Sequence, residues 1–583
     1  MVAGNDLVSL LCQRAEYGAP DIGYSFLGDG ERETARLGFA QLHRAALVLA
    51  ARLQSMSPVS KHVILAYPPG PAFIVGFFGC LYAGLVPVPV ALPHPRKPVE
   101  RLAGIAADCR AETVLSDTAG CRVLAAIAAV CGSLRIVDTA LEAAGQPIAV
   151  PASPRPEEVA FLQYTSGSTG TPRGVCVTHA NVLANLAAIQ EAERNGEHSR
   201  GVSWLPAHHD MGLIEGILQP LYAGYPTTLL PHGAFLQRPL RWLQAISRRR
   251  ATVSGGPNFA FDACVRRIGD ADLATLDLSH WEVAYCGAEP VHAETLSQFA
   301  AKFQRCGFRA SALRPVFGLA EATLLVTASD ADTAQPKVTR AVRADLERGQ
   351  LVVAHGDEVA RTLVSCGKPA RDVRVRIVDV HTLRPVAEDR VGEIWVGGPG
   401  VAAGYHGPES RSSEVFVAAD LGDGPARWLR TGDLGSMHAD ELYVTGRRKD
   451  VLIVRGRKLH PQDIEHSIQR FDPHRIAAVA VVGGEDGADE KVIALVEIAA
   501  RKSDAEAGLA GLVCLADELR AAVYREHDIA LETLAFVRQG ALARTTSGKL
   551  MRFRCRRDYL GGTMSLLACF VARGRTARAA EMA

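Results

Sequence analysis

A dense group of glycine and hydroxyl residues follows the short apolar segment 159–164. It reads Thr165-Ser-Gly-Ser-Thr-Gly-Thr-Pro-Arg-Gly174. Glycines let backbone N–H groups surround an anion, hydroxyls add donors, and an arginine binds phosphate. A flexible polar loop is the alternative. It does not explain why so many glycines and hydroxyls follow directly after an apolar strand. The loop is not of Walker A type, because GxxxxGK[ST] is absent. We therefore predict phosphate binding by Thr165, Ser166, Gly167, Ser168, Thr169, Gly170, Thr171 and Arg173.

Two further segments each contribute one acidic residue to the candidate chemistry. The first is Phe317-Gly-Leu-Ala-Glu-Ala-Thr323, and the second is Arg430-Thr-Gly-Asp-Leu-Gly435. A carboxylate such as Glu321, held near phosphates, coordinates Mg²⁺ through oxygen. A carboxylate such as Asp433, on a tight turn, accepts hydrogen bonds from ribose hydroxyls. A solvated glutamate and an ordinary β-turn are the alternatives, and each segment is a weak signal by itself.

The elements that position these residues alternate between strand and helix. Residues 62–67 and 85–90 are rich in β-formers, and residues 71–83 between them have the pattern of a helix. This alternation predicts parallel sheets with helices packed on both faces. The pattern of elements changes after residues 445–456, where glycines alternate with basic residues. A helix at 461–470 and strands at 476–482 and 491–498 then predict a small α+β unit.

Length, charge and cysteine content limit the possible classes of protein. A chain of 583 residues exceeds one core, so two or more domains are expected. The net charge of +1 argues against binding nucleic acid through bulk charge. The 13 cysteines are dispersed without a CxxC pair, which fits reduced thiols in the cytoplasm. Neither a signal peptide nor a membrane-spanning run is recognisable, so no stable membrane insertion is expected. The apolar segment 564–572 is predicted to be a docking segment or a disordered end.

Five blocks in a fixed order resemble the adenylate-forming superfamily of acyl-CoA synthetases, luciferases and peptide-synthetase adenylation domains. They are YTSGSTGTPRGV, FGLAEATLL, RTGDLG, GRRKDVLIVRG and RTTSGKLMR, and the resemblance extends from about residue 10 to residue 560. It implies an α/β fold. A large N-terminal domain (1–446) would contain helix-flanked sheets and a small barrel-like β subdomain. A small mobile α+β domain (447–583) would follow as a lid and carry a catalytic lysine.

Within that superfamily the chain looks most like the fatty acyl-AMP ligases. The closer match lies in WLPAHHDMGLIEGILQPLYAG (204–224), SGGPNFAFDACVRRI (254–268) and CGAEPVHAETLSQFAAKF (286–303). The stretch at about 328–366 resembles the insertion associated with acyl-AMP ligases. That insertion is thought to hinder the domain movement that transfer to CoA needs.

The resemblance also assigns roles to individual residues. Lys549 would bridge the fatty carboxylate and the α-phosphate, Glu321 would hold Mg²⁺, and Lys449 would be the hinge between domains. His209 would stand at the mouth of the acyl site, a role that depends on the register because Asp210 is its neighbour. The nucleotide would contact Gly287, Ala288, Glu289, Pro290, Phe317, Gly318, Asp433 and Arg447.

The acyl site is the part of the sequence that departs from the family pattern. Met211, Ile214 and Glu215 are its candidates, although ordinary core is the usual fate of the apolar residues here. Glu215 stands where a glycine is usual, and we expect it to shorten the accepted chain or select a polar substituent. His208 replaces an aromatic residue, and Arg173 replaces a frequent lysine.

These observations predict ATP-dependent activation of a fatty acid to acyl-adenylate, with release of pyrophosphate. The acyl group would pass to the phosphopantetheine of a separate acyl carrier protein, or of a polyketide or peptide synthase carrier domain. A fatty acyl-CoA synthetase is the first alternative. Amino-acid adenylation is disfavoured by His209. A catalytically inactive module that binds nucleotide or acyl chains is the alternative of another class.

Overall fold

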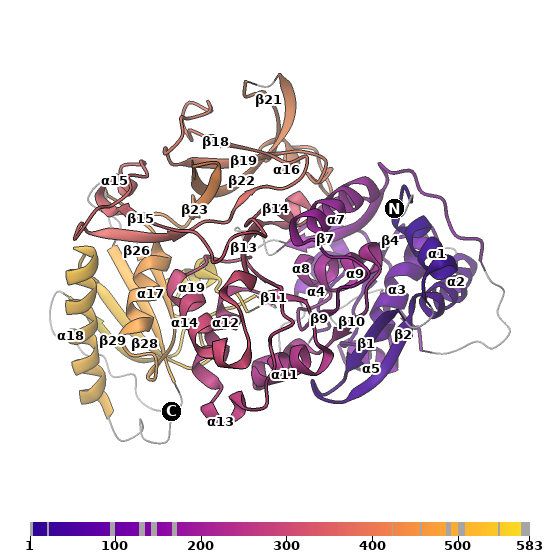
Figure 1. Ribbon diagram of the computed structural model, residues 1–583, viewed down its shortest axis with the longest axis horizontal. Coiled ribbons are helices and arrows are strands. Elements are labelled where there is room, and N and C mark those ends of the chain that lie inside the picture. Colours follow the sequence, from indigo (N-terminus) through magenta and orange to yellow (C-terminus); the bar gives the residue numbers. More distant parts are fainter. Residues whose placement is uncertain are drawn as a thin grey trace.

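The computed structural model describes residues 4–19, 22–56, 58–93, 100–127, 134–140, 149–165, 172–422, 424–454, 457–484, 491–499, 508–545 and 548–572. A large N-terminal α/β domain packs beside a smaller C-terminal domain that begins at β24 (Leu452–Val454). Figure 1 shows α17 (Pro461–Phe471) of the C-terminal domain next to α14 (Ala293–Phe303) of the N-terminal domain. This boundary matters because residues from both domains line the site described below.

A nine-stranded sheet carries several of the candidate residues at its strand ends. Its middle strands run parallel, whereas β2, β14 and β17 add antiparallel pairs, so the sheet is mixed and not wholly parallel as predicted. Ligands of open α/β sheets bind beyond the carboxyl ends of parallel strands. The order is β17 (Lys368–Pro369), β14 (Leu325–Ala328), β13 (Leu313–Gly318), β12 (Val283–Cys286), β11 (Val253–Gly256), β9 (Gly201–Ser203), β10 (Thr227–Leu229), β1 (Gly23–Leu27) and β2 (Glu33–Gly38).

A parallel four-stranded sheet and a separate hairpin flank this sheet. The four strands are β4 (Val86–Pro89), β3 (His62–Leu65), β5 (Thr113–Ser116) and β6 (Arg135–Asp138). Their connecting helices include α3 (Pro71–Tyr82), α4 (Glu100–Asp108) and α5 (Thr118–Ala126). The hairpin pairs β7 (Val159–Thr165) with β8 (Arg173–Thr178), and β20 (Gly404–Tyr405) joins it. The predicted phosphate loop connects β7 and β8, and its residues 166–171 lie outside the described residues.

A small twisted β unit and an inserted hairpin complete the N-terminal domain. The β unit contains β18 (Arg374–Val378), β19 (Gly392–Gly397), β21 (Phe416–Asp420), β22 (Pro425–His438) and β23 (Glu441–Arg447). The hairpin contains β15 (Val338–Val342), α15 (Arg343–Glu347) and β16 (Ala360–Val364). This hairpin falls within the segment that the sequence marks as an insertion.

The C-terminal domain is a four-stranded sheet covered by helices. Its strands follow the order β26 (Ile476–Gly484), β27 (Lys491–Ile498), β28 (Thr533–Arg538) and β29 (Leu566–Val571), with α18 (Gly508–His527) and α19 (Arg552–Leu560). The prediction that residues 564–572 form a docking segment or a disordered end is wrong. Most of this segment is β29, which pairs antiparallel with β28 and buries Ala568.

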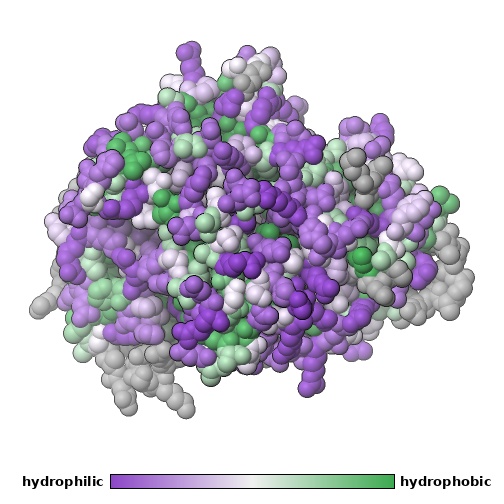
Figure 2. Space-filling model, viewed as in Figure 1, coloured by the Kyte–Doolittle hydropathy of each residue, from purple (hydrophilic) through white to green (hydrophobic). Residues whose placement is uncertain are grey.

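The described apolar side chains gather in buried clusters, while polar residues prevail on the face drawn in Figure 2. The large aromatic side chains of Trp204, Trp242 and Trp281 are fully buried in one cluster beside the nine-stranded sheet. The face seen in Figure 2 is mostly hydrophilic, with hydrophobic residues in small separate patches. Among the described helices, none combines the length and the apolar character that crossing a bilayer needs.

The strand β29 can be tested by placing a charge on its buried face. We expect Ala568→Asp to lower the free energy of unfolding by about 3 kcal/mol, because the carboxylate would be buried without a partner. Chemical denaturation followed by fluorescence measures this change. Ser565→Asp is the control, since Ser565 is exposed just before the strand. Equal stability of the two variants would contradict the pairing of β29 with β28.

Candidate active site

A cleft of about 1630 Å³ lies where the two domains meet, and residues of both domains line it. Ile214, one of the three acyl-site candidates, does not belong to this lining: it is fully buried in the main core. Gly287 is also absent from the lining and packs on Val316 instead. The predicted residues that line the cleft are Thr165, Arg173, His209, Met211, Glu215, Ala288, Glu289, Pro290, Phe317, Gly318, Glu321, Asp433, Arg447, Lys449 and Lys549.

Lys549 reaches the cleft on a tight loop of the C-terminal domain. The Lys549 amide donates to Thr545 Oγ1 at 3.0 Å, and the Thr545 amide donates to the Lys549 carbonyl at 2.8 Å. Gly548 adopts φ +88° at this turn, a left-handed conformation that glycine accepts without strain. Burial lowers the pKa of Lys549, while the negative charges of Asp210 and Glu289 oppose that shift. The ammonium group therefore depends on N-terminal-domain carboxylates.

A histidine–aspartate pair stands at the start of α8 (Asp210–Leu213). His209 Nδ1 lies 2.5 Å from Asp210 Oδ1, and the same oxygen accepts from the Met211 amide at 2.8 Å. Burial alone would raise the pKa of Asp210, but the charge and hydrogen bond of His209 outweigh it and lower that pKa. Asp210 therefore stays ionised, which adds a negative charge close to Lys549. Burial lowers the pKa of the neighbouring His208 to about 3, so His208 is neutral.

Glu321 is held by Tyr405, a residue that the sequence did not single out. The Tyr405 hydroxyl donates to Glu321 Oε1 at 2.8 Å, and the Arg173 guanidinium lies 5.3 Å from the Tyr405 ring centre. Burial raises the pKa of Glu321 and the hydrogen bond from Tyr405 opposes the rise. Tyr405 arrives through the pairing of β20 with β8, a long-range contact that no local motif announces.

Asp433 and Arg447 face each other across the register of β22 and β23. Arg447 Nε lies 3.0 Å from Asp433 Oδ1, and only 7% of the surface of Asp433 is exposed to solvent. Burial raises the pKa of Asp433, whereas the charge of Arg447 lowers it. Glu289 has a structural contact as well, because its Oε1 accepts from the Phe259 amide at 2.7 Å in the first turn of α12 (Asn258–Arg267).

The inserted hairpin contacts the C-terminal domain through three charged residues. Arg361 lies 2.9 Å from Asp463, and Glu347 accepts from Arg457 at 2.8 Å. Arg343 donates to the Glu526 carbonyl at 2.5 Å and lies 2.9 Å from His527 Nδ1. We call these contacts of Arg343, Glu347 and Arg361 the insertion clasp.

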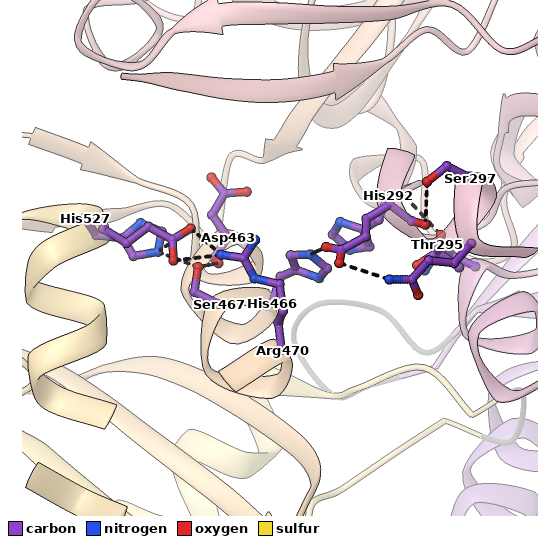
Figure 3. A network of polar contacts seen from close by, with 12 residues as sticks. His292, Thr295, Ser297, Asp463, His466, Ser467, Arg470 and His527 are labelled. Carbon is purple, nitrogen blue, oxygen red and sulfur yellow. Dashed lines mark hydrogen bonds and ion pairs between the residues drawn. The ribbon is translucent and has the colours of Figure 1, made fainter. Parts of the chain in front are cut away.

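A second contact joins the domains nearby. Figure 3 shows His466 facing His292 across the boundary, with Ser467 and His527 farther into the C-terminal domain. The two imidazole rings stack with centres 4.4 Å apart, and His466 Nε2 lies 3.3 Å from Glu294 Oε2. The insertion clasp and this stack join the two domains in the orientation in which Lys549 lines the cleft.

Comparison with known proteins agrees with this site. The model of the AMP-binding enzyme family matches residues 21–406, and that of the Disco-interacting protein 2-like AMP domain matches residues 449–568. The medium-chain-fatty-acid–[acyl-carrier-protein] ligase JamA of Moorena producens is 39% identical, over 96% of this chain and 95% of its own. The chain is a member of the AMP-binding enzyme family.

Two further relatives define its place within the family more closely. The long-chain-fatty-acid–AMP ligase FadD26 of Mycobacterium marinum is 35% identical, over 96% of this chain and 98% of its own. A solved structure from a study of fatty acyl-adenylate ligases of E. coli and L. pneumophila superimposes with a TM-score of 0.85 at 33% identity, covering 96% and 99% of the two chains. The predicted resemblance to the fatty acyl-AMP ligases and the predicted two-domain α/β fold class are confirmed.

The electrostatic setting of Lys549 in this ligase can be measured directly. We expect its amine to titrate below the ordinary lysine pKa of 10.5, because burial disfavours the charged form. Its acylation by acetic anhydride, followed by mass spectrometry across pH, gives the midpoint, and the other lysines of the same digest are internal references. Asp210→Asn should move the midpoint to still lower pH, because it removes a charge that raises this pKa. A midpoint at or above 10.5, or a rise in the variant, would contradict the arrangement.

Proposed function

We propose that this protein joins a fatty acid to AMP at the expense of ATP and then passes the acyl group to a carrier-protein thiol. In the first step a carboxylate oxygen attacks the α-phosphorus, the new P–O bond forms and pyrophosphate leaves. In the second step the phosphopantetheine thiolate attacks the acyl carbonyl and AMP leaves. One observation carries the proposal: Lys549 of one domain lies in the same cleft as Asp433 and His209 of the other.

The difficulty of the first step is electrostatic, because an anion must approach a polyanion. Two unit charges 4 Å apart repel by about 4 kcal/mol at an effective dielectric constant near 20, which is about a thousandfold in rate. A lysine between them offsets this repulsion and holds both groups in attack geometry. Asp210 and Glu289 favour the charged form of Lys549, which is the form this role requires.

The nucleotide is proposed to bind along the small β unit and the ends of β12 and β13. Asp433 would accept from the ribose hydroxyls, with Arg447 holding its carboxylate in place at 3.0 Å. Phe317, which lines the cleft, would stack on the base. Thr165 and Arg173 would bind the phosphates together with residues 166–171. Lys449, between β23 and β24, would be the hinge.

The residues present are compatible with a magnesium ion carried by the substrate. Among the described residues no group of three or more His, Cys, Asp or Glu could hold a metal ion, and Glu321 lines the cleft together with Thr165 and Arg173, which flank the predicted phosphate loop. Magnesium is usually held by one or two carboxylates together with substrate phosphates, so a single glutamate suffices. Tyr405 orients Glu321 for that contact. The ion would neutralise charge on the phosphate oxygens.

The choice of carrier protein as the acceptor of the acyl group is based on the relatives and on the insertion clasp. JamA is named as a ligase to acyl carrier protein. The resemblance to acyl-AMP ligases implies that transfer to CoA needs a movement of the C-terminal domain, and we propose that the clasp opposes it through its partly buried charged contacts. A fatty acyl-CoA synthetase shares the first step and is the second candidate only if the clasp proves ineffective.

Replacing the proposed cation tests the first step. We expect Lys549→Met to slow acyl-adenylate formation by about 100-fold to 1000-fold, because the methionine has similar length without the charge. ATP–pyrophosphate exchange over a panel of fatty acids measures the rate, and mass spectrometry identifies the product. Lys458→Met is the matched control, since Lys458 is an exposed lysine of the same domain. A normal rate in Lys549→Met would refute the mechanism.

Opening the insertion clasp tests the choice of acceptor. We expect the double variant Arg343→Ala/Arg361→Ala to raise acyl-CoA formation by about 10-fold, because two charged contacts no longer restrain the C-terminal domain. Arg340→Ala is the control, because Arg340 contacts only the inserted segment itself through Gly356 and Glu358. Acyl-CoA and carrier-bound product are quantified in the same reaction. Unchanged acyl-CoA formation in the double variant would show that the clasp does not determine which acceptor is used. Abundant acyl-CoA from the unaltered protein would favour a fatty acyl-CoA synthetase.

A further inference from the structure

A buried carboxyl group faces the cleft at an unusual turn of helix. Glu215 lies in η1 (Ile214–Leu218), a π-helical turn between α8 and α9 (Gln219–Ala223). Such turns are rare and often occur at functional sites. Glu215 is 9% exposed, yet it lines the cleft together with Met211 and Tyr285. A carboxyl in this position is costly unless something binds it.

Glu215 forms a carboxyl pair with Glu193, the last residue of α7 (His179–Glu193). Two carboxyls that share a hydrogen bond cannot both be ionised, so one of them holds a proton. Burial raises the pKa of Glu193 to about 7, and burial together with Glu193 raises that of Glu215 well above its usual range. Glu193 also accepts from Asn195 Nδ2 at 2.9 Å, which favours its ionised form. The proton therefore resides on Glu215, which donates it toward Glu193.

This arrangement leaves one oxygen of Glu215 as an unused acceptor. Glu215 Oε2 is buried and has no hydrogen-bond partner among the described residues. A carboxyl that meets Glu193 through one oxygen has its other oxygen left as an acceptor, and because Glu215 lines the cleft, that oxygen calls for a donor from the cleft.

We propose that Glu215 selects an acyl chain that carries a hydroxyl group in its middle portion, with the hydroxyl donating to the carboxyl oxygen of Glu215 that does not meet Glu193. This inference rests on the proposed function of the cleft as an acyl-adenylating site. An unsubstituted methylene would leave the oxygen buried and unpaired, and a ketone offers no proton. Sites built to bind a substrate hydroxyl discriminate strongly against the analogue that lacks it.

The helix fixes where along the chain the hydroxyl would lie. Glu215 is six residues beyond His209, which corresponds to about 9 Å along the helix axis at 1.5 Å per residue. His209 stands at the end where the carboxylate is proposed to react. The favoured hydroxyl is therefore remote from the carboxylate and not at the carbons next to it.

The test compares saturated medium-chain acids of one length that are unsubstituted, hydroxylated at successive carbons, or carry a ketone at the same carbons. Acyl-adenylate formation from each acid gives kcat/KM. With the unaltered protein we expect one mid-chain hydroxy acid to exceed the unsubstituted acid by about 10-fold to 100-fold, and the matching ketone to show no such gain. A ratio near one at every position, or an equal gain for the ketone, would overturn the proposal.

Two variants separate hydroxyl recognition from simple steric effects. Glu215→Leu removes the acceptor at similar volume, so the ratio should fall to near one. Glu215→Gln should retain the preference, because its amide N–H donates to Glu193 and its carbonyl still faces the cleft. The control Glu191→Leu, on the exposed side of the same helix as Glu193, should keep the ratio of the unaltered protein. If Glu215→Leu keeps the ratio and only admits longer chains, the residue is a steric stop and the proposal fails.

A binding measurement without turnover distinguishes failure of the proposed function from failure of the proposed role of Glu215. Absence of adenylate from every acid would refute the proposed function, and it would leave the ratio undefined. The shift in melting temperature of the unaltered protein with the hydroxy acid and with the unsubstituted acid then tests Glu215 directly. A larger shift with the hydroxy acid is expected, and equal shifts would overturn the inference.

Discussion

The structure depends on one charge that crosses a domain boundary. Lys549 belongs to the C-terminal domain, whereas the carboxylates that favour its charged form, Asp210, Glu289 and Asp433, belong to the N-terminal domain. Burial in the docked arrangement works against the ammonium group, and these three carboxylates oppose that effect. Docking therefore lowers the pKa of Lys549 below that of an exposed lysine, and the carboxylates of the other domain limit that drop.

The contacts that keep the domains docked are polar and individually modest. Charged pairs that keep some contact with water each contribute little, but several that act on one rigid body restrain it together. Arg343, Glu347 and Arg361 come from the inserted hairpin and meet three different parts of the C-terminal domain. The hairpin also reaches the cleft, because Arg361 and Thr362 of β16 belong to its lining.

Buried acids in the cleft behave in opposite ways because their neighbours differ. Asp210 is paired with His209, which keeps it ionised despite burial. Glu215 is paired with another carboxyl, which forces a shared proton and leaves a neutral group. The same chemistry of burial thus yields a fixed negative charge at one end of α8 and a hydrogen-bonding oxygen beyond the other end.

The order and content of the sequence motifs indicated the family and the fold class. The same motifs singled out Lys549, Glu321 and Asp433 as candidate site residues, because short blocks of fixed composition encode local turns and loops. The helix predicted at 71–83 is found at Pro71–Tyr82 for the same reason. Only the tertiary structure decided which candidates meet. Met211 and Glu215 face the cleft while Ile214 turns into the core, because the π-helical turn changes which residues share a face. Tyr405 reaches Glu321, and residues 566–571 become a strand, through pairing with β8 and β28. Such pairings join residues far apart in the chain, and their free energy depends on partners that no local window contains.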